Sequence, residues 1–150
     1  MWEILGGLLI GTAVSGIVPL INAELLVVGA AIAAPGIGVP LLAAVSTAGQ
    51  MSTKTVLYGV ARWAPRWLPP RARAVLGRAS GALAARGGTA GSLVFASAAI
   101  GVPPFYGVSL AAGALEMRLR DFLVSGAVGR VVRFGALAWT ARYVGEGILP

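Results

Sequence analysis

The stretch GIVPLINAELLVVGAA, residues 16 to 31, joins two short apolar runs at Pro19 and carries a carboxylate, Glu24, five residues after that proline. Neither run is long enough to span a bilayer, because a helix rising about 1.5 Å per residue needs about 20 residues to cross a core of roughly 30 Å. Short apolar segments paired across a proline are typical of re-entrant hairpins, whose irregular tips must be buried in protein or line a wet cavity. The stretch therefore predicts a helical hairpin with an acid near its tip.

The composition of the whole chain indicates a membrane environment. Of its 150 residues 57% are hydrophobic and 11% are charged, with a mean hydropathy of +0.85, whereas soluble domains have about 25% charged residues. The chain has no cysteine and no histidine, which excludes disulfides, thiolate or imidazole metal ligands, cysteine nucleophiles and serine-histidine dyads. We therefore expect an all-α integral membrane protein of one domain, which is not an enzyme and needs no cofactor or metal.

Proline and glycine divide the apolar sequence into segments of unequal length, of which only two are long enough to span. We expect a first hairpin at about 4–33, a transmembrane helix at about 38–62, a basic loop at about 63–87, a second hairpin at about 88–115 and a second transmembrane helix at about 122–145. The hairpin tips are expected at Pro19 and Asn22 and at Pro103 and Pro104.

The two halves of the chain repeat the same pattern. Pro19 and Gly29 recur as Pro103 and Gly113, and after a small difference in the connection Gly49 and Arg62 recur as Gly129 and Arg142. A unit of one re-entrant hairpin and one spanning helix crosses the membrane once, so successive copies are inverted, as in many secondary transporters. The glycines at 49 and 129 are expected to allow close packing of helices.

The basic residues are concentrated between the two halves. No acidic residue lies between Leu25 and Leu115. The positive-inside rule therefore places the basic loop in the cytoplasm and explains the net charge of +7 without nucleic acid. Inverted hairpins put Arg118 and Arg120 on the same side as the loop, which full crossings would not. The arginines expected on this side are Arg62, at the end of the first transmembrane helix, and Arg66, Arg71, Arg73, Arg78 and Arg86 of the loop. The part of the loop from Arg71 onward is either a surface helix against anionic headgroups or a solvated loop.

Four charged residues are expected at membrane depth: Glu24, Lys54, Arg130 and Arg133. Each costs on the order of 2.5 to 3.5 kcal/mol at a helix centre, so something must offset them. Either an ion pair holds a hairpin to a helix, or the charges line a polar cavity; one acid facing three bases favours an anionic ligand. Gln50 lies one turn before Lys54 on a predicted polar face that also includes Thr47 and Tyr58, at intervals of three and four.

Two further residues near the first hairpin tip have alternative roles. Asn22 either caps the second limb of its hairpin or contacts a ligand. Glu24 has no acidic counterpart in the second half, where the offset of the repeat gives Val108 as the equivalent position. This asymmetry favours a functional site over a purely structural pair.

Together, PLINAELLVVGAA (19–31), GQMSTKTVLYGVAR (49–62), LAAGALEMRLRDFL (110–123) and GRVVRF (129–134) resemble the DedA/VTT-domain (SNARE-associated Golgi protein-like) superfamily, in particular its short YqaA-like bacterial branch. The resemblance covers roughly residues 16 to 143. It implies two re-entrant hairpins of opposite orientation, residence in the bacterial cytoplasmic membrane, and transfer of polar lipids such as phospholipids or polyprenyl phosphates. Carried over by position, Glu24 matches the hairpin acid of the family, and Arg130 and Arg133 match basic positions of the last helix. Many members also carry arginines around the second hairpin's proline, whereas SAAIGVPPFYGVSLAAG (97–113) has none.

The sequence thus predicts a multi-pass lipid transporter or scramblase. Arg130, Arg133 and Lys54, with Gln50, are expected to contact a lipid phosphate, because an arginine fork donates two hydrogen bonds at once. Glu24 either balances these cations or takes up a proton during transport. The alternatives are a proton-coupled exporter of a small solute and a membrane scaffold that transports nothing. GxxxG spacings, such as Gly7 with Gly11, permit a homo-oligomer and equally permit packing within one chain.

Overall fold

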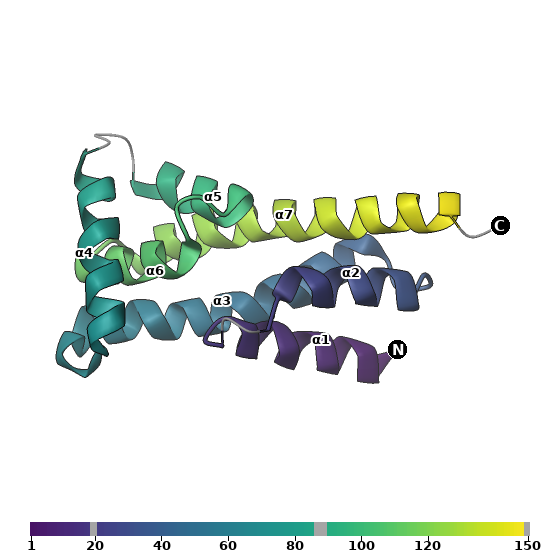
Figure 1. Ribbon diagram of the computed structural model, residues 1–150, viewed down its shortest axis with the longest axis horizontal. Coiled ribbons are helices and arrows are strands. Elements are labelled where there is room, and N and C mark those ends of the chain that lie inside the picture. Colours follow the sequence, from purple (N-terminus) through teal and green to yellow (C-terminus); the bar gives the residue numbers. More distant parts are fainter. Residues whose placement is uncertain (19–20, 86–89, 149–150) are drawn as a thin grey trace. The chain divides into compact units, whose positions relative to one another are not determined.

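The computed structural model describes residues 1–18, 21–85 and 90–148, and within these ranges every regular element is a helix (Figure 1). The all-α class predicted from the sequence is confirmed. The helices are α1 (Trp2–Ser15), α2 (Ala23–Ala33), α3 (Val39–Trp63), the 3-10 turn η1 (Pro65–Trp67), α4 (Pro70–Ala85), α5 (Ala90–Ile100), α6 (Phe105–Ala114) and α7 (Leu119–Ile148).

Proline and glycine separate these helices for identifiable reasons. Pro70 is the first residue of α4, where its missing N–H costs no hydrogen bond. Gly101 follows α5 with φ 90°, a conformation that side chains disfavour. Pro104 occupies the N-cap of α6. Glu116 ends the turn after α6 and has a positive φ of 56°, the one such residue besides glycine in the described chain. The left-handed conformation is common just after a helix.

The chain forms two compact units. The first consists of Met1–Thr53 and Arg130–Pro150, and the second of Lys54–Gly129. Each unit contains one pair of short helices and parts of both long helices, because α3 passes from the first unit to the second after Thr53 and α7 returns to the first at Arg130.

In the first unit α1 and α2 pack against each other as a hairpin (Figure 1). A Cβ at Gly11 of α1 would meet the side chain of Leu26 of α2 at 2.8 Å, so the glycine allows the close approach. The core beneath this hairpin is apolar and combines residues of α1 and α2 with the adjoining parts of α3 and α7. Its fully buried members include Val27, Leu42 and Phe134.

In the second unit α6 is the central helix, packed against both α5 and α4. The basic segment that the sequence left as either loop or helix is the helix α4. Its apolar residues Ala72 and Leu76, together with Leu68 just before the helix, pack with Leu110 of α6. The apolar side of α4 is therefore occupied by protein. Its arginines face outward: Arg71, Arg73 and Arg78 are exposed, and Arg86 lies outside the described residues.

The repeated glycines mark the same kind of contact in each unit. A Cβ at Gly49 of α3 would collide with the hydroxyl of Thr12 and the carbonyl of Leu9 on α1. A Cβ at Gly129 of α7 would lie 2.7 Å from both Ala98 Cβ and the Phe95 carbonyl on α5. In both units a long helix thus presents a glycine to the first limb of the hairpin, and the close helix packing predicted for Gly49 and Gly129 is confirmed.

The repeated arginines also have matching roles. Arg142, near the end of α7, donates from its guanidinium to the carbonyls of Ala34 and Ile37, just after the first hairpin. Arg62, at the end of α3, donates to the carbonyl of Met117 at 3.1 Å, just after the second hairpin. Each long helix therefore ends by holding the exit of the hairpin that belongs to the other half of the sequence.

Judged by length and composition, α7 is the one helix in the described part of the chain that is both long and apolar enough to cross a membrane, over Leu119–Val144. Helix α3 has 25 residues but lacks the apolar content. The four hairpin helices are apolar but have only 10 to 14 residues, so the re-entrant arrangement stays a prediction.

Candidate functional site

The acid of the first hairpin is held at the start of α2. Asn22 is the N-cap of this helix, and its side-chain oxygen accepts a hydrogen bond of 2.8 Å from the backbone N–H of Glu24. The cap satisfies one of the free N–H groups of the first turn. Of the two roles that the sequence allowed for Asn22, the capping role is confirmed, and it places Glu24 at a defined position one residue into the helix.

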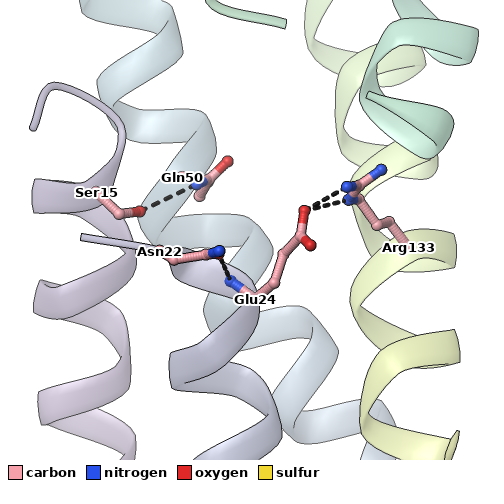
Figure 2. Close-up of polar contacts among 5 residues, drawn as sticks. All are labelled: Ser15, Asn22, Glu24, Gln50 and Arg133. Carbon is pink, nitrogen blue, oxygen red and sulfur yellow. Dashed lines mark hydrogen bonds and ion pairs between the residues drawn. The ribbon is translucent and has the colours of Figure 1, made fainter. Parts of the chain in front are cut away.

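From this position Glu24 reaches α7 and forms an ion pair with Arg133 (Figure 2). One carboxylate oxygen of Glu24 accepts hydrogen bonds from two nitrogens of the guanidinium, Nε at 2.9 Å and a terminal nitrogen. The two side chains are 37% and 21% exposed. The pair is therefore partly open and leaves the second carboxylate oxygen and the third guanidinium nitrogen outside this contact.

Arg130 lies one turn before Arg133 on α7 and is more deeply buried, with 8% of its surface exposed. Its guanidinium lies over the ring of Phe134, 5.6 Å from the ring centroid. Its charge is repelled by that of Arg133 and attracted by that of Glu24. Two cations and one anion therefore share this site, which leaves one positive charge in excess.

Gln50 of α3 belongs to the same unit and is 6% exposed. Its amide nitrogen donates a hydrogen bond of 3.0 Å to the hydroxyl of Ser15 at the end of α1 (Figure 2). The sequence predicted Gln50 as a polar residue of the site but gave no indication of Ser15. The amide is thus anchored to the first limb of the hairpin, whereas Glu24 reaches the site from the second limb.

Lys54 belongs to the second unit, although it lies only one turn beyond Gln50 on α3. It is 5% exposed, and its ammonium group lies 5.3 Å from the ring centroid of Tyr106 on α6. The polar face predicted along α3 is real, because Thr47, Gln50, Lys54 and Tyr58 are all buried. The face nevertheless divides between the two units, with Thr47 and Gln50 in the first and Lys54 and Tyr58 in the second.

The counterpart of Glu24 in the second unit is Tyr106 rather than Val108. Glu24 is the second residue of α2, and Tyr106 is the second residue of α6. Both side chains contact a cation on a long helix, Arg133 for Glu24 and Lys54 for Tyr106. The sequence offset came from glycines and prolines and missed the different lengths of the hairpin connections, which shift the helix start by two residues. The second unit therefore has no acid at the position equivalent to Glu24, as predicted.

The predicted hairpin tips are described only in part. Pro19 lies outside the described residues. In the second unit the carbonyl of Pro103 accepts a hydrogen bond of 2.5 Å from Ser97, and Pro104 precedes the first turn of α6. Asn22 and these two prolines therefore organise the ends of helices.

The second unit also contains a pocket that the sequence did not predict. It has a volume of about 610 Å³, and none of the proposed site residues lines it. Its lining residues are Ala90, Gly91, Met117, Arg120, Asp121, Val124 and Ser125.

Comparison with known proteins adds no assignment, since no family model, curated protein or solved structure matches the chain. The chemistry of the site must therefore be judged from its residues. Two guanidinium groups with one carboxylate can bind and orient an anion such as a phosphate, because arginine donates paired hydrogen bonds to such groups.

Proposed function

We propose that this chain is a multi-pass membrane protein of DedA/VTT type that moves a phosphate-bearing lipid across the bilayer. The observation that carries this proposal is the orientation of α7. Its valines Val131 and Val132 are 43% and 53% exposed, and Trp139 is 59% exposed, while Arg130, the residue before Val131, is 8% exposed. A water-soluble protein would turn such a helix the other way, because apolar side chains gain most from burial and charged ones lose most.

Inward-facing arginines on a helix with an apolar outer surface are expected in a membrane protein with a functional polar interior. The excess positive charge of Arg130, Arg133 and Glu24 fits an anionic headgroup better than it fits a self-neutralising structural pair. The partly exposed carboxylate and guanidinium are accessible to such a group. Lipid transfer requires a polar path of this kind, because the barrier is the passage of the headgroup through the hydrocarbon core.

The internal repeat is supported by equivalent contacts within the two units. Gly49 and Gly129 each lie against the first limb of a hairpin, and Arg62 and Arg142 each hold a hairpin exit. The proposal takes the two copies to be inverted, as in many secondary transporters. The proposal places the exposed arginines of α4 in the cytoplasm, according to the positive-inside rule.

The test is transbilayer movement of a headgroup-labelled phospholipid in proteoliposomes. The wild type is compared with Arg133→Ala, with the matched control Arg78→Ala, an exposed arginine of α4, and with empty vesicles. We expect movement well above that in empty vesicles, reduced roughly 10- to 100-fold by Arg133→Ala, the effect of losing a charge-assisted hydrogen bond, and unchanged in Arg78→Ala.

Equal rates in all four samples, with the variants folded, would contradict lipid transfer. A proton-coupled exporter of a small solute would instead lose pH-dependent solute flux in Glu24→Gln while lipid movement stayed at the level of empty vesicles. In a scaffold without transport, Arg133→Ala would lower stability and change no flux.

A further inference from the structure

Buried hydroxyl groups in the described part of the chain divide into two kinds. Five residues donate to backbone carbonyls: Tyr58 to Met117, Thr12 to Leu8 at 2.7 Å, Thr53 to Ala13 at 2.6 Å, Ser97 to Pro103 at 2.5 Å and Ser109 to Phe105 at 2.7 Å. Ser46 and Thr47 of α3, which are 0% and 5% exposed, have no hydrogen-bond partner. A helical hydroxyl commonly bonds the carbonyl one turn earlier, so these two depart from the pattern of the rest.

Gln50 of the same helix presents a third such oxygen. The hydroxyl hydrogen of Ser15 is used in a bond of 2.7 Å to the carbonyl of Thr12. Ser15 can therefore only accept from Gln50, which fixes the amide with its nitrogen towards Ser15, at 3.0 Å, and its oxygen away from α1 (Figure 2). This oxygen, Oε1, is buried and has no partner.

The three oxygens lie on one face of α3. Ser46 and Gln50 are four residues apart, and Thr47 and Gln50 are three apart, which are the spacings of neighbours on a helix surface. Buried polar atoms without a partner are rare in proteins, because each loses its hydration without replacement. Three within two turns of one helix indicate that a ligand supplies the missing hydrogen bonds.

The chemistry of the three groups limits what that ligand is. An amide oxygen only accepts, so the ligand must bring a hydrogen-bond donor. A metal cation is disfavoured, because the acid of this unit's site, Glu24, is engaged by Arg133 and the site already holds an excess positive charge. The donor is therefore a hydroxyl, or an ammonium whose charge is balanced within the same ligand.

We propose that Ser46, Thr47 and Gln50 form a subsite that recognises hydrogen-bond donors on the headgroup of the transported lipid. The inference rests on the proposed function: Arg130 and Arg133 take the phosphate, and Gln50 Oε1 accepts from a hydroxyl or primary ammonium attached to it. Headgroups of the glycerol or ethanolamine kind fulfil this condition. A choline headgroup does not, because its nitrogen carries no hydrogen. Gln50 is thus the specificity-determining residue.

The test measures binding separately from transport. Phosphatidylglycerol, phosphatidylethanolamine and phosphatidylcholine of identical chains are offered in equal amounts to the detergent-solubilised protein, and the bound species are counted by native mass spectrometry. We expect the wild type to prefer the first two over phosphatidylcholine by about tenfold, the effect of one hydrogen bond to a buried acceptor. A further sample contains excess glycerol phosphate, which has no acyl chains. If the headgroup alone is enough for binding, glycerol phosphate displaces the lipid.

Three variants locate the preference. Gln50→Met keeps the volume and removes the strong acceptor, so the preference should vanish while lipid still binds. Gln50→Glu keeps an acceptor and should retain the preference for ethanolamine. Ser52→Ala, at an exposed position of the same helix, is the matched control and should behave as the wild type does.

A wild type that binds the three lipids equally, or binds none, overturns the subsite, as does a preference that survives in Gln50→Met. A preference found in the binding assay together with no lipid movement in vesicles overturns the proposed function and leaves the subsite standing. The failures of the two proposals are therefore distinguishable.

Discussion

The first unit, built on the hairpin of α1 and α2, and the second, built on the hairpin of α5 and α6, consist of corresponding elements but differ in what fills their centres. The first brings Glu24, Arg130 and Arg133 together. The second stacks aromatic rings, with Phe122 5.1 Å from Tyr58 and 6.2 Å from Phe105 between centroids.

This difference distinguishes the contacts that maintain the fold from those that form the candidate site. The glycine contacts and the arginine bonds to the hairpin exits occur in both units, so they are requirements of the fold. The charged cluster belongs to the first unit. At the equivalent position the second unit has the contact between Lys54 and Tyr106. A duplicated scaffold can hold different chemistry in its two copies, because backbone contacts carry the architecture and leave the side chains at the helix starts free to differ.

The glycine contacts should give the largest effects, and in both units alike. Gly49→Ala and Gly129→Ala each force a methyl group against hairpin backbone, which should lower the free energy of unfolding by about 3 kcal/mol. Gly29→Ala, in the interior of α2 with nothing within 4 Å of the new Cβ, should raise it by about 0.5 to 1 kcal/mol. Denaturant titration in detergent measures all three. If Gly49→Ala lowered the free energy of unfolding and Gly129→Ala did not, the two units would not be equivalent.

The arginine bonds to the hairpin exits come next. Arg142→Met and Arg62→Met remove charge-assisted bonds to carbonyls in the first and second units, and each should cost about 1.5 to 3 kcal/mol of the free energy of unfolding. Arg73→Met, at an exposed position of α4, should change it by no more than about 0.5 kcal/mol. If either exit variant matched this control, the reciprocal role would not hold for that unit.

The ion pair should show a smaller effect that belongs to the first unit alone. Glu24→Ala leaves Arg130 and Arg133 without their anion and should cost about 1 to 2 kcal/mol, less than the roughly 3 to 5 kcal/mol of a fully buried pair because both partners are partly exposed. Adding Arg130→Met to Glu24→Ala should recover part of the loss by removing the like charge. A double-mutant cycle of Glu24 and Arg133 measures the coupling directly, and a coupling of zero would contradict the pair.

The contact of Lys54 with Tyr106 should give the smallest effect. Tyr106→Leu removes the aromatic face and should cost about 1 kcal/mol. Tyr106→Phe keeps the ring and should preserve most of the stability. Equal losses in the two variants would assign the stabilisation to the tyrosine hydroxyl instead of the ring. Lipid movement in vesicles should change in neither, if the first unit alone contains the site.

The sequence by itself determined the helical architecture and the breaks between helices. Proline acts locally, so the break at Pro104 before α6 could be predicted without knowledge of the rest of the chain, and capping by Asn22 was one of the two roles that the sequence allowed. The repeat of Gly49 and Arg62 as Gly129 and Arg142 was also visible, because each pair keeps one spacing along a continuous helix.

Only the tertiary structure decided which polar groups meet. By sequence alone Glu24 has three candidate cations. The rotation of α7 about its axis, set by packing in the first unit, selects Arg133 and places Arg130 beside it. Packing within the second unit brings Lys54 to Tyr106, which makes Tyr106 the counterpart of Glu24 there. Ser15, which anchors Gln50 from 35 residues away, carries no local signal. Spacing along a chain defines a helix face, but which face a neighbouring helix offers in return depends on the burial of many side chains at once.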